Sequence, residues 1–272
     1  VYDNVFLNND IGILVDGIQD LDFSAKNLDT FGILIKNCRI YNSKFEGLIA
    51  NFKGGNNHNN KIINVECSFS KLGNGFKVRN CNLIKCKAHW NKFYGFILLN
   101  VDYLYKCYSF NNQTGILVAS TTDDDFQAPF FKFNNHLETD IKIKSGKIET
   151  NTTNFYNCVI RGSLGGSGIV YTVYSSYSLF VNCEISGNQG SLESFYDVVT
   201  YKRNYYFTGG GIKGFKDNSL CFINCSIVGN LGYGICILDD LKRIMSLVTP
   251  DREKLTDYED NELEMDYYSY YI

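Results

Sequence analysis

The sequence predicts an all-β fold in which short strands coil into a parallel solenoid of about nine rungs, closed by a short helical cap. One phrase recurs at intervals of roughly 20 to 30 residues, which is typical of repeat architectures. Its clearest copy reads Cys107-Tyr-Ser-Phe110, then Asn111, then Gly115-Ile-Leu-Val118. Both halves alternate with the period of a strand, and the Gly suits a bend between them. The chain has only two prolines, which fits ladders that use almost every backbone N–H.

The copies follow one another along most of the chain. They begin near Phe6, Cys38, Cys67, Cys86, Cys107, Phe131, Cys158, Cys183 and Cys225. The copy at Phe131 lacks the Cys and runs to residue 143, and insertions interrupt the pattern near residues 119–130 and 189–208. Units this short cannot bury a face alone, so they must stack on their neighbours.

Two residue types are predicted to form columns along the coil. Seven cysteines fall at one repeat position, where we expect a buried column of small apolar side chains: Cys38, Cys67, Cys86, Cys107, Cys158, Cys183 and Cys225. Adjacent strands lie about 4.8 Å apart, slightly too far for relaxed disulfide geometry between side-by-side Cβ vectors. Asparagines recur near the turns, and an internal amide ladder is favoured over a row facing a glycan: Asn42, Asn91, Asn111, Asn134, Asn188 and Asn230.

The pattern changes after residue 238, which divides the chain into a predicted coil over residues 1–238 and a C-terminal region over residues 239–272. Apolar side chains recur there at helical spacing, at Leu241, Ile244, Met245 and Val248. A helix over the last rung would cover its open strand edges, so we expect a helical cap. The remainder of this region is acidic and rich in tyrosine, with eight carboxylates against two basic side chains in residues 251–266.

Over residues 1–238 the chain resembles the right-handed parallel β-helices of the pectin-lyase-like superfamily. More loosely, Phe222-Ile-Asn-Cys225-Ser-Ile227 and Gly209-Gly-Gly-Ile212 are similar to repeats of bacterial polymorphic outer-membrane adhesins. The resemblance implies a right-handed coil of parallel strands. It does not decide the activity, because the same coil carries lyases, hydrolases, epimerases, phage tailspikes, adhesins and scaffolding proteins.

Composition excludes several classes of function. No run reaches the roughly eighteen apolar residues of a membrane helix, so no transmembrane segment is predicted. The net charge of −3 gives no nucleic-acid footprint. No Cys-x-x-Cys pair is present, and no metal site is predicted. The chain begins directly in a strand-like phrase, so we expect it to belong to a longer chain or assembly on an extracellular or particle surface.

Catalytic candidates follow the Gly-Ile strands of successive rungs. They are Arg79, Asp102, Asp123 and Asp124. Carboxylates on adjacent rungs could act as general acid and base on a glycosidic bond, or hold Ca²⁺ while Arg79 abstracts a proton. Outside that chemistry no cofactor is expected. The motifs of polygalacturonases and pectate lyases are missing, so a polysaccharide lyase or glycoside hydrolase acting on an acidic or neutral glycan is the alternative interpretation, and no catalytic residue is assigned.

Aromatic side chains give binding candidates in two places. Trp90 and Tyr94 flank a turn, where aromatic faces aligned along the coil can stack on sugar rings. The insertion after Cys183 holds a group whose Tyr and Arg content is typical of recognition surfaces: Tyr201, Arg203, Tyr205 and Tyr206. We therefore predict a non-catalytic binding or structural module of a larger surface or scaffolding protein, which recognises a protein partner or a glycan through aromatic loops on one flank. The same loops disfavour a purely structural spacer.

Overall fold

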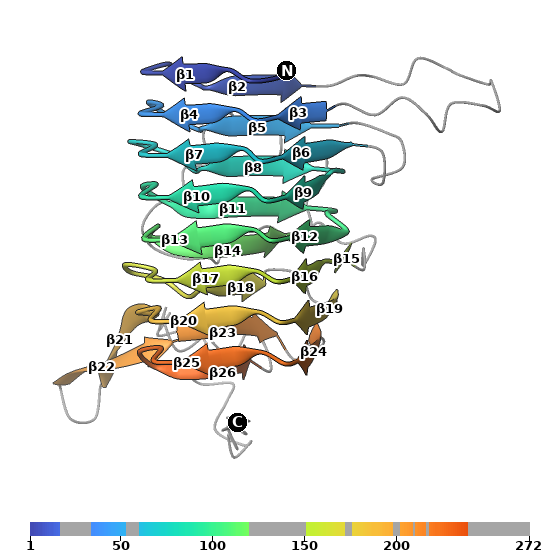
Figure 1. Cartoon of the computed structure of the whole chain (residues 1–272). Coiled ribbons are helices and arrows are strands. Elements are labelled where there is room, and N and C mark those ends of the chain that lie inside the picture. Colours follow the sequence, from blue (N-terminus) through green and yellow to red (C-terminus); the bar gives the residue numbers. More distant parts are fainter. Residues whose placement is uncertain are drawn as a thin grey trace, which may run out of the picture.

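The described part of the chain forms a stack of eight rungs, and three parallel sheets run along the axis of the stack (Figure 1). The computed structural model describes residues 1–16, 34–52, 60–119, 151–171, 176–197, 202–208, 210–215 and 218–238. Each full rung gives one strand to sheet A, then one to sheet B and one to sheet C. Because the chain returns to the same sheet once per turn, each strand pairs with its equivalent in the next rung.

Every pair within the three sheets is parallel. Sheet B contains β1 (Val5–Leu7), β4 (Arg39–Tyr41), β7 (Glu66–Ser68), β10 (Lys87–His89), β13 (Tyr108–Phe110), β17 (Val159–Arg161), β20 (Glu184–Ser186) and β25 (Ser226–Val228). Sheet C contains β2 (Ile13–Asp16), β5 (Leu48–Asn51), β8 (Phe76–Arg79), β11 (Tyr94–Leu99), β14 (Thr114–Ala119), β18 (Ile169–Tyr171), β23 (Gly210–Phe215) and β26 (Tyr233–Leu238). Sheet A contains β3 (Leu34–Lys36), β6 (Lys61–Ile63), β9 (Asn82–Ile84), β12 (Tyr103–Tyr105), β16 (Asn154–Tyr156), β19 (Ser176–Val181), β24 (Asn218–Ile223) and the short β15 (Asn151–Thr152), which pairs with the start of β19.

The rungs are numbered from the N-terminus. Rung 1 is β1–β2, rung 2 is β3–β5, rung 3 is β6–β8, rung 4 is β9–β11, rung 5 is β12–β14, rung 6 is β16–β18, rung 7 is β19, β20 and β23, and rung 8 is β24–β26. Between β20 and β23 the chain forms an antiparallel hairpin of β21 (Ser191–Asp197) and β22 (Lys202–Thr208), which projects from the side of the stack (Figure 1). This hairpin lies in the second predicted insertion.

The stack has one rung fewer than the sequence predicts. The strands β12, β13 and β14 of rung 5 pair directly with β16, β17 and β18 of rung 6. A rung made from residues 131–143 therefore cannot stand between them. That prediction rested on apolar alternation, which does not distinguish a rung from an insertion. The predicted helical cap over residues 239–272 lies outside the described residues.

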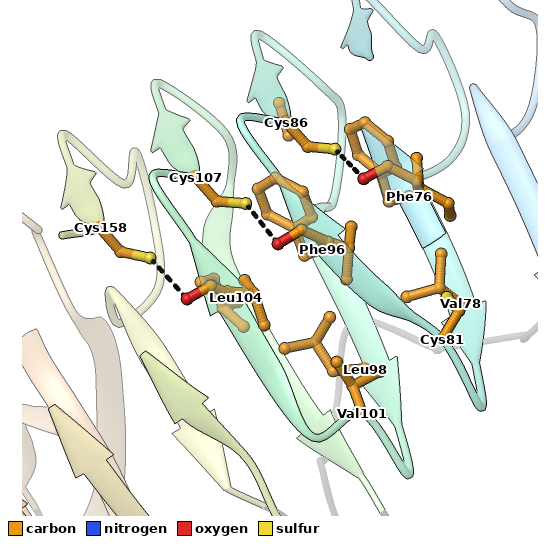
Figure 2. Close-up of a cluster of buried hydrophobic side chains, with 14 of the residues drawn as sticks. Phe76, Val78, Cys81, Cys86, Phe96, Leu98, Val101, Leu104, Cys107 and Cys158 are labelled. Carbon is orange, nitrogen blue, oxygen red and sulfur yellow. Dashed lines mark hydrogen bonds between the residues drawn. The ribbon is translucent and has the colours of Figure 1, made fainter. Parts of the chain in front are cut away.

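Apolar side chains from all three sheets fill the interior of the coil (Figure 2). Equivalent side chains on successive rungs stack on one another. Phe76 and Phe96 have ring centroids 4.8 Å apart, and Phe155, Phe180 and Phe222 follow at 4.6 and 4.9 Å. These spacings match the separation of adjacent strands, about 4.8 Å, so the stacking follows directly from the parallel register.

The predicted cysteine column lies at the bend between sheets A and B, facing the interior. Its members are Cys38, Cys86, Cys107, Cys158, Cys183 and Cys225, and all ten cysteines of the chain are free thiols. Several of these thiols donate to a carbonyl of the preceding rung: Cys86 Sγ to Ile62 O at 3.3 Å and Cys107 Sγ to Leu83 O at 3.6 Å (Figure 2). The column therefore combines small volume with weak hydrogen-bond donors, and it needs no disulfide.

Cys67 was wrongly predicted to belong to this column. Val65 takes the column position in rung 3, because the Glu66 N–H bonds to the Cys38 carbonyl. Cys67 lies two residues further on, opposite Ile40 in the rung before it. Side chains alternate along a strand, so a shift of two residues keeps an apolar side chain inside and leaves the sequence pattern unchanged.

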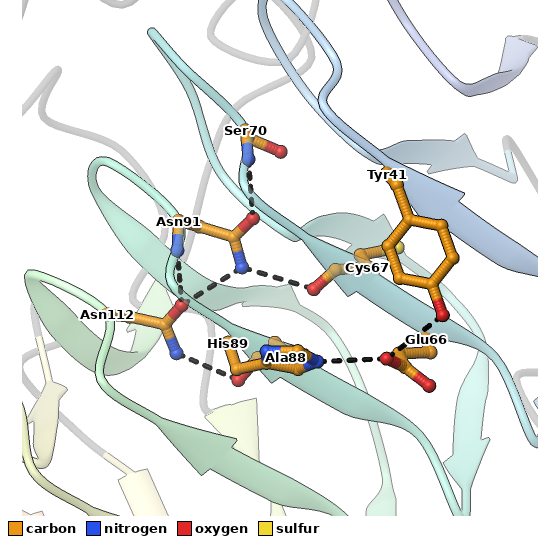
Figure 3. Close-up of polar contacts among 8 residues, drawn as sticks. All are labelled: Tyr41, Glu66, Cys67, Ser70, Ala88, His89, Asn91 and Asn112. Atoms are coloured by element: carbon orange, nitrogen blue, oxygen red, sulfur yellow. Dashed lines mark hydrogen bonds and ion pairs between the residues drawn. The ribbon is translucent and has the colours of Figure 1, made fainter. Parts of the chain in front are cut away.

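An internal amide ladder is present at the bend between sheets B and C. Asn91 Nδ2 donates to Asn112 Oδ1 at 2.9 Å, and the same oxygen accepts the Asn91 backbone N–H at 3.0 Å (Figure 3). Asn188 Nδ2 donates to Asn230 Oδ1 at 2.9 Å in the same way. These amides form hydrogen bonds with backbone groups at the bend, which have no partner in the strand pairing of the sheets.

The predicted ladder is displaced by one residue in two rungs. Asn42 and Asn111 lie in the bend itself with positive φ, immediately before the ladder position. The neighbouring residue, such as Asn112, points inward instead. Because asparagine suits both positions, the sequence alone does not show which residue of the pair Asn111-Asn112 belongs to the ladder. Asn134 lies outside the described residues.

Gly75→Ala is expected to destabilise the coil. A Cβ at Gly75 would lie 2.7 Å from the Gly95 carbonyl oxygen and 2.8 Å from Asn91 Nδ2, and neither group can move without breaking the stack. We expect the free energy of unfolding to fall by about 2–3 kcal/mol in urea denaturation. Gly234 holds the equivalent position in rung 8, where the nearest atom of the described residues to a Cβ is 3.5 Å away. Gly234→Ala should be close to neutral, and equal losses at both positions would contradict this explanation.

The thiols are expected to react in the order of their exposure. Burial raises the pKa of Cys67, Cys81 and Cys107, so little thiolate forms there at neutral pH. Cys221 and Cys225 are only partly buried. We expect iodoacetamide to label these two first in the folded protein, and the remaining thiols only after unfolding, as followed by peptide mass spectrometry. Labelling of Cys107 as fast as Cys225 would show that the column is accessible.

Candidate binding surface on sheet B

Every rung turns into sheet B, and out of it, through a single residue with a left-handed backbone. Entering sheet B, φ lies between 50° and 55° at Asp3, Asn37, Asn64, Lys85, Lys106, Asn157, Asn182 and Asn224. Leaving sheet B, φ lies between 54° and 66° at Asn8, Asn42, Phe69, Trp90, Asn111, Gly162, Gly187 and Gly229. Glycine adopts this conformation freely and Asn or Asp tolerate it, whereas other residues lose roughly 1–2 kcal/mol.

Four residues depart from this pattern, and all four lie in rungs 3 to 5. Lys85 and Lys106 replace Asn or Asp on entry, and Phe69 and Trp90 replace Asn or Gly on exit. They carry a conformational cost that the other twelve positions avoid. Backbone strain of this kind is concentrated at functional sites. Because the two turns flank sheet B, the four residues border the outer face of β7, β10 and β13.

We call this surface the sheet B patch. It comprises Tyr41, Glu66, Phe69, Lys85, Lys87, His89, Trp90, Lys106, Tyr108 and Phe110. The lysines form one edge, Phe69 and Trp90 form the other, and outward side chains of sheet B lie between them.

The lysine edge is exposed, and the carboxylate nearest to it in the register of sheet B is Glu66, opposite Lys87. Lys85, Lys87 and Lys106 are all exposed, and none has an acidic partner among the described residues. Lys87 Nζ lies 6.0 Å from the ring centroid of Tyr108, and Lys106 Nζ lies 5.3 Å from that of Tyr105. At these distances the ring faces attract the ammonium groups and hold them near the surface.

The two strained lysines also interrupt a chain of amides. In rungs 1–3, and again in rungs 6–8, the residues entering sheet B are linked by side-chain hydrogen bonds of 2.7–3.4 Å. Asn64 Nδ2, for example, donates to Asn37 Oδ1 at 2.8 Å. Lys85 and Lys106 occupy the two rungs between these runs. Exposed positive charge thus stands where the other rungs have asparagine amides or, in rung 1, the Asp3 carboxylate.

A hydrogen-bonded trio occupies the centre of the patch (Figure 3). Tyr41 Oη donates to Glu66 Oε1 at 3.2 Å, and His89 Nε2 lies 3.0 Å from the same oxygen. A carboxylate can only accept, so His89 donates through Nε2–H. Partial burial and the Glu66 carboxylate raise the pKa of Tyr41, which keeps its hydroxyl protonated at neutral pH. Glu66 Oε2 has no protein partner among the described residues and remains an acceptor.

His89 is fixed from both sides by aromatic rings. Its ring stacks on Phe110 with centroids 4.6 Å apart and planes 5° apart, and the edge of Phe69 meets it at 5.9 Å. The Nδ1 atom is buried without a hydrogen-bond partner among the described residues. Beside this stack, Phe69 and Trp90 are 47% and 48% exposed, so the second edge offers apolar surface to solvent.

The patch lacks the carboxylate pair of a glycosidase. The next carboxylate along this face of sheet B is Glu184, four rungs from Glu66, which corresponds to about 19 Å of strand spacing. Glycosidases hold their two carboxyl groups about 5–9.5 Å apart. The arrangement therefore offers charge, aromatic surface and fixed acceptors, without a site for general acid and base catalysis of that kind.

Trp90 lies in the patch, whereas Tyr94, predicted to accompany it, does not. Tyr94 is the first residue of β11 and packs against a second apolar cluster on the outer face of sheet C. The buried members of that cluster are Ile49, Ile97, Leu99, Leu117, Ala119 and Val170. The turn between sheets B and C therefore sends the two aromatic side chains to different faces.

The other predicted residues lie elsewhere. Arg203, Tyr205 and Tyr206 belong to β22 of the hairpin. Arg79 ends β8 of rung 3, and Asp102 lies just before β12 of rung 5. Three residues lie outside the described part of the chain: Asp123, Asp124 and Tyr201. The catalytic interpretation thus stays a prediction.

Sequence reasoning missed the lysine edge, although a signal was present. The column cysteines follow directly after the turn residue, so Asn37-Cys38 aligns with Lys85-Cys86 and with Lys106-Cys107. The replacement of Asn by Lys could have been read from that alignment. The same alignment does not identify Phe69, because it places Cys67 in the cysteine column, two residues away from its position in the structure.

Comparisons of the chain with protein-family models, curated proteins and solved structures find no match. Within the described residues, no helix is long and apolar enough to cross a membrane, and no group of three or more His, Cys, Asp or Glu could hold a metal ion. The function must therefore be argued from the geometry of the patch.

Replacing Lys85 and Lys106 together by Asn is expected to stabilise the protein. Asn adopts the left-handed backbone more readily than Lys and can extend the amide chain. We expect the free energy of unfolding to rise by about 1–2 kcal/mol, and calorimetry to show a Tm a few degrees higher. Lys87→Asn is the control, since Lys87 lies in a strand and should give no gain. A double variant less stable than the parent would contradict the strain argument.

Proposed function

We propose that this chain is a non-catalytic binding module, which holds a protein partner or a glycan against the sheet B patch. The observation that supports this is the gathering of four strained turn residues around three adjacent strands. A coil that served only as a spacer would gain stability from Asn or Gly at these positions. Lysine and aromatic side chains are retained there because they contact something outside the coil.

The patch is organised before a partner arrives. Neighbouring rungs fix equivalent positions about 4.8 Å apart. Two donors orient the Glu66 carboxylate, and two rings restrain His89. Side chains that are already ordered lose little conformational entropy on binding, which favours affinity.

The chemistry of the patch limits what it can bind. The lysine edge attracts anionic groups, and Glu66 Oε2 can accept a hydrogen bond. Phe69 and Trp90 offer flat apolar surface to a sugar ring or to the side chain of a protein. A partner must therefore combine negative charge with an apolar face, and both an acidic protein surface and a glycan can do so.

The proposal also includes the handedness of the coil, its similarity to a known superfamily and its cellular setting. We infer a right-handed coil, because parallel crossover connections strongly favour that hand. The similarity to the pectin-lyase-like superfamily agrees with the three-sheet stack. A rigid coil with one prepared face fits a module of a larger protein or assembly on a cell or particle surface.

Removing the aromatic edge is expected to weaken partner binding. Phe69→Gly with Trp90→Gly leaves residues that suit the left-handed turns, so the coil should keep its stability. We expect binding in pull-down and glycan-array assays to weaken by about tenfold or more, as for loss of a buried aromatic contact. Because Trp90 is the only tryptophan, its fluorescence should also change when the partner binds to the parent chain.

The matched control is Tyr177→Ala, which removes a side chain that is 49% exposed on sheet A, away from the patch. This variant should bind as the parent does. If the double glycine variant recovers the same partners in full, the proposed function is wrong.

A further inference from the structure

The two ends of the described stack expose apolar side chains (Figure 1). Sheets B and C end at rung 1 on one side and at rung 8 on the other. Of the fifteen exposed large hydrophobic side chains among the described residues, nine lie in these two rungs or just before rung 1: Val1, Tyr2, Val5, Leu7, Leu14, Ile223, Val228, Leu231 and Tyr233. The end repeats of a solenoid that face water are instead polar on their outer side.

The amide ladder at the bend between sheets B and C points out of the stack at rung 1. A ladder asparagine bonds to the rung before it. Asn188 Oδ1 accepts the Ser163 N–H at 3.1 Å, and Asn188 Nδ2 donates to the Ile160 carbonyl at 3.3 Å. Asn9 holds the ladder position in rung 1, as the backbone hydrogen bonds of the bend show. Its side chain is exposed, and among the described residues no rung precedes it.

Rung 8 has the matching groups on its open side. The N–H and Nδ2 of Asn188 both donate to Asn230 Oδ1 in the next rung, at 3.1 and 2.9 Å. Asn230 is the last ladder asparagine of the described stack, and its Nδ2 donates back to the Ile185 carbonyl at 3.0 Å. If Asn9 followed Asn230, its Oδ1 would accept from Asn230. Its Nδ2 would donate to the carbonyl of Ile227, which is the equivalent of Ile185.

A glycine of rung 8 indicates the same contact. The glycines of this column pass close to the glycine carbonyl of the next rung. A Cβ at Gly47 would lie 2.7 Å from the Gly75 oxygen, and a Cβ at Gly168 would lie 2.8 Å from the Gly211 oxygen. At Gly234 the nearest atom of the described residues is 3.5 Å away. The described coil therefore has room for a side chain at this position, whereas a further rung in register would require glycine.

We propose that rung 1 of one copy of this chain stacks on rung 8 of a second copy, in the parallel register of the coil. Asn9 then continues the ladder from Asn230, and the Gly12 carbonyl faces Gly234. This inference goes beyond the proposed function, because the contact does not involve the sheet B patch. The helical cap expected over residues 239–272 is the competing occupant of rung 8, and the experiment below decides between the two.

The side chains of the two end rungs are compatible. In the register of sheet B, Phe6 is equivalent to Ile227 and Leu7 to Val228. Phe6 and Ile227 are partly buried and pack against the core, so stacking would complete their burial. Leu7 and Val228 are each 55% exposed and would cover one another on the outside. Residues 218–238 of rung 8 include no charged side chain, so the acidic residues of rung 1 meet no like charge.

The contact joins two different surfaces, so each pair of copies still has one free end of either kind. Such a contact adds further copies in a line instead of closing into a ring. Eight rungs at about 4.8 Å give a length of about 38 Å per copy. The sheet B patch lies on the flank and would recur along the rod at this interval.

Sedimentation velocity of the full chain over a hundredfold range of protein concentration tests the stacking. We expect longer species to replace monomers as the concentration rises, and electron microscopy to show rods with about 38 Å per copy. Gly234→Ala should keep the Tm of the parent but weaken association about a hundredfold, because the new methyl group meets the Gly12 carbonyl. Asn9→Ala, at an exposed position, should weaken association about tenfold. Tyr177→Ala, on the flank of sheet A, should associate as the parent does.

A mixture of chains tests the direction of stacking. Gly234→Ala keeps an intact rung 1, so an excess of it should bind rung 8 of the parent and stop growth at pairs. A parent chain that stays monomeric at every concentration would overturn the proposal and favour a cap over rung 8. Association that neither Gly234→Ala nor Asn9→Ala weakens would also overturn it, since another surface would then make the contact. The Phe69→Gly, Trp90→Gly variant should still stack, so this test is separate from that of the proposed function.

Discussion

The parallel register of successive rungs is the constraint on which the rest of this structure depends. Each rung must pass through the same three strands and the same bends, because a displaced residue would break the ladder to the rungs on both sides. Every position in one rung therefore has an equivalent about 4.8 Å away. Sulfur atoms, amides and phenyl rings then form columns, as Cys86 with Cys107 and Phe76 with Phe96 do. The same rule makes any departure from a column conspicuous.

Departures at the bends are informative because the backbone there restricts the choice of residue. The local energy of a left-handed turn favours Asn, Asp or Gly. Twelve of the sixteen turn positions flanking sheet B hold one of these residues. Core packing cannot explain the four exceptions, since Lys85, Lys106, Phe69 and Trp90 carry exposed side chains. Local backbone energetics do not select these residues, and contact with a partner is the reason that we propose for them.

The sequence was sufficient to predict the architecture, but it was not sufficient to predict the sheet B patch. Period-2 runs and the recurring cysteines predicted short stacked strands, because burial of one strand face imposes that pattern directly. The same pattern is unchanged by a shift of two residues, so Cys67 was assigned the position of Val65. It also made residues 131–143 resemble a rung. The patch could not be predicted as a unit, because Tyr41, Glu66 and His89 come from three rungs and meet only once the register between rungs is known.

The outer faces of sheets B and C differ in the side chains that they bury and expose. Sheet C buries apolar side chains on its outer face as well as its inner one, with Ile97 and Leu117 at 3% and 5% exposure, so that face adds to the core. Sheet B instead leaves charged and aromatic side chains on its outer face, where each contributes only a weak contact. Affinity on such a surface must come from several contacts made together at the rung spacing.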